Sequence, residues 1–258
     1  NLGARGSQRV DMPSRWMEQP YSAEKISMKI EILPSADQVA EKAAAYLEQL
    51  IQETLTHKKT FSMAISGGRT PWEMLKILSK ASLPWSRVNL FQVDERIAPD
   101  AHEDRNLTQL FQAIEGSPMA SQLAIFPMPV TAEDLEAGSQ DYAELIQNIT
   151  EGGGLDLIHL GMGSDGHTAS LVPGDEVLEV QDRNVAFTKE LYQGRIRMTL
   201  TYPLINSAKK ILWLVTGAEK KEMVQRLLNQ DASIPAGAVN QMNALLLVDE
   251  LALGNGSD

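Results

Sequence analysis

Residues 155–174 read LDLIHLGMGSDGHTASLVPG and carry the plainest structural signal in the chain. The residues from Leu155 to Leu160 are mostly apolar and show no helix signal, so they predict a buried strand. Three glycines follow, and glycine lets a backbone turn sharply and bring its N–H groups close to a ligand. Asp165 and His167 are interleaved with the last of these glycines. His167 therefore stands just past the carboxyl end of a strand, where open α/β sheets place their chemistry, and we expect a short helix to begin there.

The glycines of this stretch allow three interpretations. The spacing of Gly161, Gly163 and Gly166 fits the dinucleotide-binding fingerprint, but that motif needs a long helix, and Pro173-Gly174 stop one after about two turns. A structural turn with an incidental histidine is the second interpretation. The third, which we favour, is a catalytic histidine in a glycine cradle.

The composition is that of an ordinary globular protein, with 43% hydrophobic and 22% charged residues among 258. The net charge of −11 disfavours nucleic acid and anionic membranes as partners. No apolar run approaches the ~20 residues that a membrane span requires. The absence of cysteine excludes disulfides, thiolate metal sites and cysteine nucleophiles. We therefore expect a protein of a reducing compartment, the cytoplasm.

Predicted strands alternate with predicted helices along the chain, which gives a mainly parallel sheet with helices on both faces. We therefore predict a three-layer α-β-α, Rossmann-like fold. Predicted strands cover residues 28–33, 60–65, 88–93, 155–160, 211–215 and 244–248, with short antiparallel-capable strands at 184–188 and 197–201. Predicted helices cover residues 36–56, 107–114, 132–150 and 218–229, and one more starts near residue 71. The Pro-rich segment 115–131 is expected to be a connection.

We expect residues 28–253 to form a single domain, because no linker divides them and no period repeats. Residues 1–27 are polar and aperiodic, so we expect a flexible arm or a remnant added for expression. Residues 254–258 are expected to fray.

A Gly-Gly loop leads from the second predicted strand into a helix. In Ser66-Gly-Gly-Arg-Thr-Pro71, Thr70 suits the N-cap, Pro71 suits the first helical position, and Glu73 completes a capping box with Thr70. Free N–H groups and the helix dipole favour an anion there, and Arg69 adds a positive charge. A plain turn between strand and helix is the alternative.

Charged residues stand at two further places where a buried element ends or begins. Asp94-Glu95-Arg96 follow a predicted buried strand, which is unusual unless the three residues face a site; a solvated strand end is the alternative. Lys220 and Lys221 lie in the first turn of a predicted helix, where cations oppose the dipole. A bound anion would compensate them, whereas a solvated lysine pair would carry a small cost.

Taken in order, these stretches resemble the 6-phosphogluconolactonase family. The matching pieces cover about residues 30 to 250: Ser66 to Pro71, Asp94 to Arg96 with Pro99 and Asn106, Gly161 to Gly174, Arg197 to Thr201, Asn206 to Ala208, Val215 to Gly217 with Lys220, and Ile234 to Ala236. The resemblance implies the fold of glucosamine-6-phosphate deaminases and, more distantly, ribose-5-phosphate isomerases. Arg69 and Arg105 depart from the pattern, because the family often has Ser at both places.

The resemblance implies hydrolysis of 6-phospho-D-glucono-1,5-lactone to 6-phosphogluconate in the oxidative pentose phosphate pathway. The residues support such chemistry through an activated water. Histidine has an ordinary pKa near neutrality, so His167 is the expected general base. Asp165 or Asp94 is expected to orient its imidazole. Arg96 and the N–H groups of the glycine cradle are the expected donors to the oxyanion.

The phosphate of the substrate is expected to bind the loop after the second strand. The predicted phosphate ligands are Gly67, Gly68, Arg69, Thr70, Arg197 and Lys220. Such a local cluster would let an acidic chain bind a phosphate ester. We expect no metal and no cofactor, since His57, His102, His159 and His167 form no close ligand pair in the sequence. His159 lies inside a predicted strand and is expected to be a core residue.

Three alternatives remain open. Ser170 is a possible nucleophile, although the Gly-x-Ser-x-Gly elbow is absent. A glucosamine-6-phosphate deaminase/isomerase would use Asp94 as its base, but the Phe-Asn-Glu-Pro run of that family is replaced by Ser170-Leu-Val-Pro173. A non-catalytic sugar-phosphate sensor is the third.

The expected partner is a phosphorylated sugar lactone, with no nucleic acid or membrane partner. The chain is expected to be a monomer or a weak homodimer.

Overall fold

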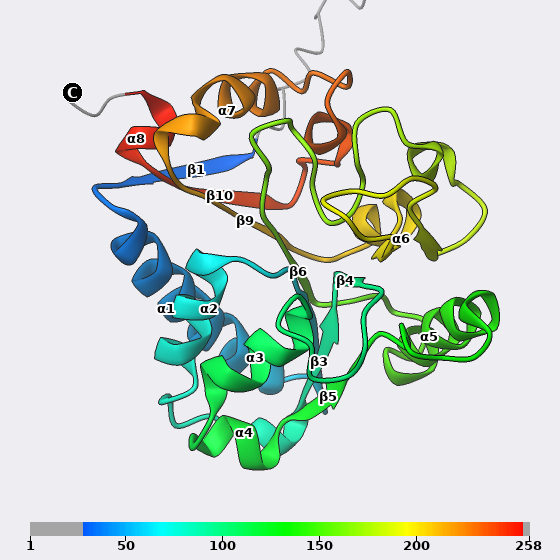
Figure 1. Ribbon diagram of the computed structural model, residues 1–258. Helices are drawn as coiled ribbons and strands as arrows, with labels where there is room; N and C mark the ends of the chain where they lie inside the picture. The colour runs from blue at the N-terminus through cyan, green and yellow to red at the C-terminus, as the bar shows by residue number, and fades with distance from the viewer. Residues whose placement is uncertain (1–27, 255–258) are drawn as a thin grey trace, which may run out of the picture.

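The computed structural model describes residues 28–254 of the chain (Figure 1). The predicted arm, residues 1–27, lies outside them, as does all of the predicted tail except residue 254. Neighbouring strands of the main sheet come from both ends of the described chain. On that ground we propose that residues 28–253 form one domain.

Seven strands form the main sheet, in the order β1-β10-β9-β6-β2-β3-β5, and every neighbouring pair is parallel. The strands are β1 (Lys29–Leu33), β2 (Phe61–Ile65), β3 (Val88–Gln92), β5 (Ala124–Phe126), β6 (Leu157–Leu160), β9 (Ile211–Val215) and β10 (Ala244–Asp249). The central strands are buried along their whole length, as expected for a parallel sheet covered on both faces. The prediction of a mainly parallel α/β fold is confirmed.

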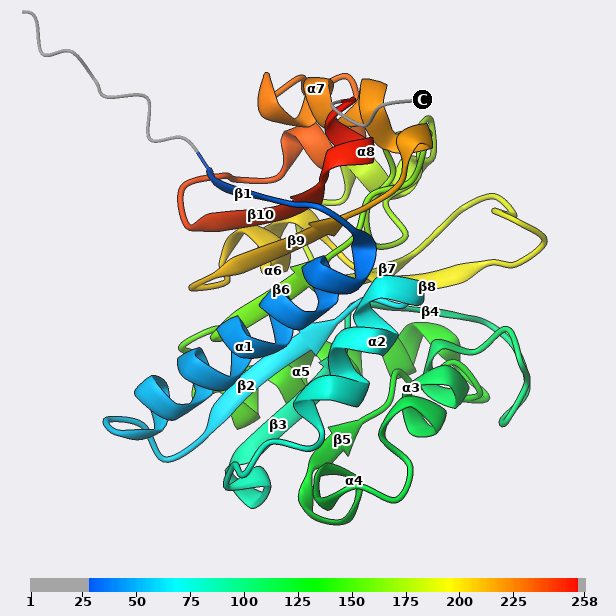
Figure 2. The ribbon, with the colours of Figure 1, turned by 90° about the vertical axis from the view of Figure 1, so that its left-hand side faces the viewer.

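Helices cover both faces of this sheet (Figures 1 and 2). One face packs against α1 (Ala36–Leu55), α2 (Arg69–Leu78), α3 (Asn106–Ile114) and α4 (Pro118–Gln122). The other packs against α5 (Leu135–Ile149), α6 (Tyr202–Asn206), α7 (Lys221–Leu228) and α8 (Glu250–Leu253). Figure 2 shows α1 and α2 in front of the sheet and α5 behind it.

Successive residues of a strand serve opposite layers, because side chains alternate across a sheet. Met63 packs into the core under α1 and α2, whereas Ala64 packs into the other core. Leu212 and Trp213 divide in the same way on β9. The continuous apolar runs that predicted the strands therefore supply two cores.

A second sheet of three antiparallel strands lies on the α5 side, in the order β4-β8-β7. Its strands are β4 (Asp94–Arg96), β7 (Val185–Phe187) and β8 (Arg197–Leu200). The antiparallel strands predicted near residues 184–188 and 197–201 are thus confirmed. Arg96 pairs with Arg197 across the β4–β8 ladder, which brings two cations to the same place.

Two predicted segments differ from the structure. The connection expected at residues 115–131 contains α4 and the edge strand β5, which are too short to show a period in the sequence. After His167 the chain turns instead of starting a helix: the Leu171 N–H donates to the Thr168 carbonyl at 2.9 Å, and the two residues form an antiparallel bridge.

Two predicted helix starts are also shifted. The helix expected from residue 132 begins at Leu135, because Asp134 caps it by accepting the N–H of Ala137 at 3.0 Å. The helix expected from residue 218 begins as a 3-10 turn, Ala218–Lys220, and continues as α7. Three other 3-10 turns cover Trp85–Arg87, Glu176–Glu179 and Pro235–Ala238.

The strand order reverses between β2 and β6: the chain proceeds outward from β2 to β3 and β5 on one side, and from β6 to β9 on the other. Such a switch point leaves a crevice outside the carboxyl ends of the strands, where ligands of α/β proteins bind. The loops after β2, β6 and β9 all open there.

Within residues 28–254, each helix is too short or too polar to cross a membrane.

Candidate active site

A cavity of about 580 Å³ opens at this switch point. All the predicted site residues except Asp165 line it: Gly67, Gly68, Arg69, Thr70, Asp94, Arg96, His167, Arg197 and Lys220. They come from the loops after β2, β6 and β9 and from the small sheet. The fold therefore brings together residues that lie more than a hundred positions apart in the sequence.

The turn after β6 sets the position of His167. Its backbone closes through two hydrogen bonds, from Gly163 N–H to the His167 carbonyl at 2.9 Å and from Gly166 N–H to the Gly163 carbonyl at 3.0 Å. A Cβ atom on Gly163 would overlap the His167 ring. Glycine is needed there because the imidazole lies directly against the backbone.

Asp165 orients the imidazole. Its Oδ1 lies 2.6 Å from His167 Nδ1 and also accepts the His167 backbone N–H at 3.0 Å. The hydrogen bond from the His167 side chain holds the pKa of Asp165 well below its usual range, so this carboxyl is ionised near neutral pH. An ionised carboxylate favours the tautomer with the proton on Nδ1, which leaves the lone pair on Nε2.

Tyr192 completes this cluster from the loop between β7 and β8. Its hydroxyl donates to Asp165 Oδ2 at 2.9 Å and lies 3.1 Å from His167 Nδ1. Burial, with the nearby Asp165 carboxylate, raises the pKa of Tyr192 to about 12. The phenol is therefore protonated at neutral pH and stays a donor.

Asp94 makes different contacts. The hydroxyl of Ser170 donates to Asp94 Oδ2 at 2.6 Å, and the Asn106 amide donates to the Asp94 carbonyl at 3.0 Å. Of the two carboxylates considered from the sequence, Asp165 is the one that contacts the His167 imidazole. Ser170 is fully buried, so its hydroxyl serves Asp94.

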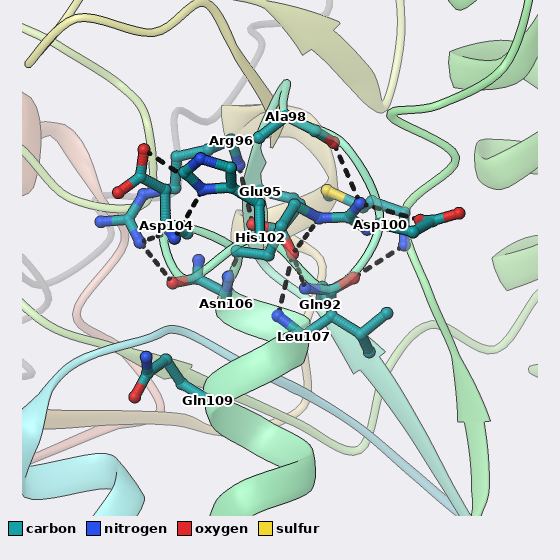
Figure 3. Close-up of polar contacts among 12 residues, drawn as sticks. Gln92, Glu95, Arg96, Ala98, Asp100, His102, Asp104, Asn106, Leu107 and Gln109 are labelled. Atoms are coloured by element: carbon teal, nitrogen blue, oxygen red, sulfur yellow. Dashed lines mark hydrogen bonds and ion pairs between the residues drawn. The ribbon is translucent and has the colours of Figure 1, made fainter.

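Arg96 is held at the cavity wall by α3 and the loop before it (Figure 3). Its Nη1 donates to the Asp104 carbonyl and to Asn106 Oδ1, each at 2.9 Å. Its buried Nε lacks a protein acceptor in the described part of the chain. The guanidinium of Arg96 lines the cavity, where its positive charge can stabilise a developing negative charge.

Glu95 points away from the cavity, although Asp94 and Arg96 on either side of it line the cavity. Its fully buried carboxylate accepts the N–H groups of Asn106 at 2.8 Å and Leu107 at 2.9 Å, the first two residues of α3 (Figure 3). It also lies 3.1 Å from Arg105 Nε, an ion pair without hydrogen-bond geometry. Glu95 therefore caps α3 from a neighbouring strand, and Arg105, which departs from the family pattern, balances its charge.

The loop after β2 presents the start of α2 to the cavity. The predicted capping box is wrong: Gly68 is the N-cap, with a φ of 141° that favours glycine, and α2 begins at Arg69. The Thr70 hydroxyl instead lies 3.1 Å from the Thr216 hydroxyl across the sheet. The N–H groups at the start of α2 thus face the cavity without a side-chain cap, as an anion site requires.

Four cations line the cavity, Arg69, Arg96, Arg197 and Lys220, beside the carboxylates of Asp94, Glu219 and Asp249. Arg197 is buried, and burial, together with the nearby Arg96, lowers its pKa; its Nη2 donates to Gln193 at 2.8 Å. Arg69 is exposed and Lys220 is half-buried, and both line the cavity. The cavity lining therefore has a small excess of positive charge in a chain whose net charge is −11.

His159 is a core residue, as predicted. Its Nδ1 accepts the backbone N–H of Ser66 at 3.2 Å, which ties β6 to the loop after β2. Complete burial lowers the pKa of His159 to about 3, so the ring is neutral near pH 7. Within residues 28–254, no three His, Asp or Glu side chains gather as a metal site would need.

The sequence did not single out Tyr192, and it gave Asn106 only as part of a family motif. Tyr192 lies in a loop and Asn106 at the start of a helix. They contact Asp165 and Arg96, which are 27 and 10 residues away in the sequence, respectively. The pairing of Asp165 with His167 is local, which is why the sequence could suggest it.

Known proteins resemble this chain over most of its length. The sequence profile of the glucosamine-6-phosphate isomerases/6-phosphogluconolactonase family matches residues 34–248. A 6-phosphogluconolactonase of Synechocystis sp. is 31% identical over 233 residues, which are 87% of this chain and 96% of that protein.

Solved structures share the fold. The 6-phosphogluconolactonase of Thermotoga maritima has a TM-score of 0.75 at 24% identity, and the alignment covers 86% of this chain and 98% of that one. A monomeric glucosamine-6-phosphate deaminase has a TM-score of 0.72 at 22% identity, covering 89% and 100%. The fold is thus common to both activities, whereas the sequence match is to the lactonase. The chain belongs to the 6-phosphogluconolactonase family, within the group that also includes the glucosamine-6-phosphate isomerases.

Proposed function

We propose that this protein hydrolyses 6-phospho-D-glucono-1,5-lactone to 6-phosphogluconate, with a water activated by His167. The observation that carries the proposal is the Asp165–His167 pair, 2.6 Å between Oδ1 and Nδ1, at the wall of a cavity that also holds cations and an uncapped helix start. Family membership and the match to a named lactonase support the substrate.

In the proposed first step, His167 Nε2 takes a proton from water while the water oxygen attacks the lactone carbonyl carbon. The carbonyl electron pair moves to oxygen, and the guanidinium of Arg96 stabilises the resulting oxyanion. The expected donors of the glycine cradle do not contribute Gly163 or Gly166, because both N–H groups already donate within the turn. The ionised Asp165 stabilises the imidazolium that forms.

In the proposed second step, the oxyanion re-forms the carbonyl and the bond from that carbon to the ring oxygen breaks. The ring oxygen takes the electron pair and receives the proton from the imidazolium, which restores neutral His167. The product is a carboxylic acid that releases one proton at neutral pH, so turnover can be followed as acid production.

The phosphate is proposed to bind at the start of α2. The backbone of Gly67 and Gly68 and the side chains of Arg69 and Thr70 form one side of that site, and Lys220 lies at the cavity wall beyond β9. Arg197 supplies a further charge from the small sheet. An N–H cluster together with point charges suits a phosphate dianion.

Two alternatives predict other chemistry at the same site. Ser170 as a nucleophile is disfavoured, because its hydroxyl is fully buried and donates to Asp94. A deaminase would use the Asp94 carboxylate, which does line the cavity. That activity would need a carboxylate after the histidine, where this chain has Ser170 to Pro173.

The experiment is a proton-release assay with freshly generated 6-phosphogluconolactone, corrected for spontaneous hydrolysis. The same preparation is tested for ammonia release from glucosamine 6-phosphate and for calorimetric binding of 6-phosphogluconate. Accelerated acid production without ammonia supports the proposal. Ammonia release would establish the deaminase, and binding of 6-phosphogluconate without turnover of the lactone would establish a sensor.

The cytoplasmic location and the monomeric or weakly dimeric state stay predictions. The absence of cysteine favours a reducing compartment. Sedimentation velocity at several protein concentrations tests the second, and a stable dimer at low concentration would contradict it.

A further inference from the structure

We infer that Tyr192 is a positioning residue that links the catalytic base to the substrate-binding arginine Arg197. The inference rests on the proposed function, because it assigns Tyr192 a part in that reaction. Tyr192 would contribute two groups to the site: a hydroxyl group, which contacts Asp165, and an aromatic ring, which contacts Arg197.

The hydroxyl group fixes the Asp165–His167 pair. It donates to Asp165 Oδ2 at 2.9 Å, while Asp165 Oδ1 faces His167 Nδ1 at 2.6 Å. The two carboxylate oxygens are thus occupied by different partners, which prevents the carboxylate from rotating away from the imidazole. Removing the hydroxyl would leave Asp165 Oδ2 without this donor.

The ring of Tyr192 lies between the base and the arginine. Its centroid is 5.1 Å from that of His167, with the planes at 64°, an edge-to-face arrangement. The guanidinium carbon of Arg197 lies 4.9 Å from the centroid of the same ring. A cation over an aromatic face is attracted to it, so the ring helps to hold Arg197 at the cavity.

The loop that carries Tyr192 is itself fastened to a second loop. Tyr192 and Arg195 form an antiparallel bridge. Arg195 donates from Nε at 3.1 Å and from Nη2 at 2.9 Å to Asp104 Oδ2, in the loop between β4 and α3. Figure 2 shows both loops projecting on the same side of the molecule. The Asp104 carbonyl accepts from Arg96 Nη1 at 2.9 Å, so the contacts that place Tyr192 continue to another residue of the site.

Two substitutions separate the roles of the hydroxyl and the ring. Tyr192→Phe keeps the ring and removes the hydroxyl, so kcat should fall by roughly tenfold while KM stays within about twofold, given the strength of a hydrogen bond to a charged group. Tyr192→Leu removes the ring as well, so KM should also rise by roughly tenfold as Arg197 is released. A role limited to stability would lower the amount of folded protein and leave kcat per folded molecule and KM unchanged.

Tyr202→Phe is the matched control. The hydroxyl of Tyr202 donates to the Pro235 carbonyl at 2.9 Å, and Tyr202 lies outside the active-site cavity. All variants are assayed with 6-phosphogluconolactone beside the parent, with active molecules counted by calorimetric binding of 6-phosphogluconate.

The split between kcat and KM, with Tyr202→Phe unchanged, supports the inference. An active parent with full kcat in Tyr192→Phe would overturn it and leave the proposed function standing. An inactive parent would overturn both.

Discussion

Lys220 and Lys221 are adjacent lysines in different surroundings. Lys220 lines the cavity, whereas Lys221 is exposed and lies near Gly254. If Lys220 binds the substrate phosphate, Lys220→Met removes a hydrogen bond to a charged group. The loss should lower kcat/KM for 6-phosphogluconolactone by about 10- to 100-fold. Unphosphorylated gluconolactone should be hydrolysed at the parent's rate, since it has no group for this lysine to bind.

Lys221→Met is the control, because it removes the same charge from the same turn. Steady-state kinetics give kcat/KM for the parent and both variants with each of the two lactones. Equal losses in the two variants would mean that Lys220 acts through the general field of the protein and does not contact the phosphate.

At this scale the sequence predicts what is local. Asp165 and His167 are two residues apart, and their glycine surroundings suggested the pairing. Tyr192 reaches the same pair from a loop 25 residues later, where a hydroxyl and a ring are joined to their partners by loop geometry. Such contacts leave no periodic signal in a sequence, so they appeared only with the structure.

At the scale of elements, the N-terminus of α3 depends on one buried carboxylate. Glu95 accepts the first two N–H groups of this helix and balances Arg105. Glu95→Ala should therefore lower the free energy of unfolding by about 3–5 kcal/mol, because it removes the acceptor of two helix N–H groups and leaves buried Arg105 paired only with the exposed Asp100. Urea unfolding followed by circular dichroism measures the loss.

Glu115→Ala, at the exposed end of the same helix, is the matched control and should stay within about 0.5 kcal/mol of the parent. The variant Arg105→Ala should lose stability as well, and combining it with Glu95→Ala should cost less than the sum of the two, because the pair is removed together. Strict additivity would show that the 3.1 Å ion pair is not energetically coupled.

Element prediction succeeded where burial dominates and failed where distant contacts decide. The parallel strands are apolar along their length, so the sequence indicated them directly. The Thr70 cap failed because its hydroxyl pairs with Thr216, 146 residues away. β5 escaped detection because it is three residues long and only half-buried.

At the scale of the whole molecule, His159 couples stability to pH. Its folded pKa of about 3 lies below the ordinary value near 6.5. The neutral ring therefore stabilises the fold fully above about pH 6.5, and the unfolded chain gains the proton as the pH falls toward 3. Each pH unit in this window should remove about 1.4 kcal/mol from the free energy of unfolding.

His159→Asn places an amide oxygen where Nδ1 accepts from Ser66 and removes the titrating ring. Between about pH 7 and about pH 5 the parent should lose about 2 kcal/mol more than this variant in urea unfolding. The exposed His57→Asn serves as control and should follow the parent. Parallel curves for the parent and His159→Asn would show that His159 does not titrate with the folding transition.

The assembly of the site also belongs to this scale. The strand order brings the loops after β2, β6 and β9 to one edge, and the small sheet adds Arg96 and Arg197. Alternation of strands and helices predicts a parallel sheet, but strand order depends on long-range packing that the pattern does not encode. The family resemblance implied that residues of these loops and of the small sheet form one site, but it gave no strand order.

His167 is the proposed general base for lactone hydrolysis. Its most direct test is kcat/KM for fresh 6-phosphogluconolactone in the parent and in His167→Ala, measured as acid production above the spontaneous rate, with folding verified by circular dichroism. We expect kcat/KM to fall by at least roughly a hundredfold in the variant, the low end of a general-base contribution. A folded His167→Ala that is nearly as fast as the parent would contradict it and assign the proton transfer to another group, with Asp94 the next candidate.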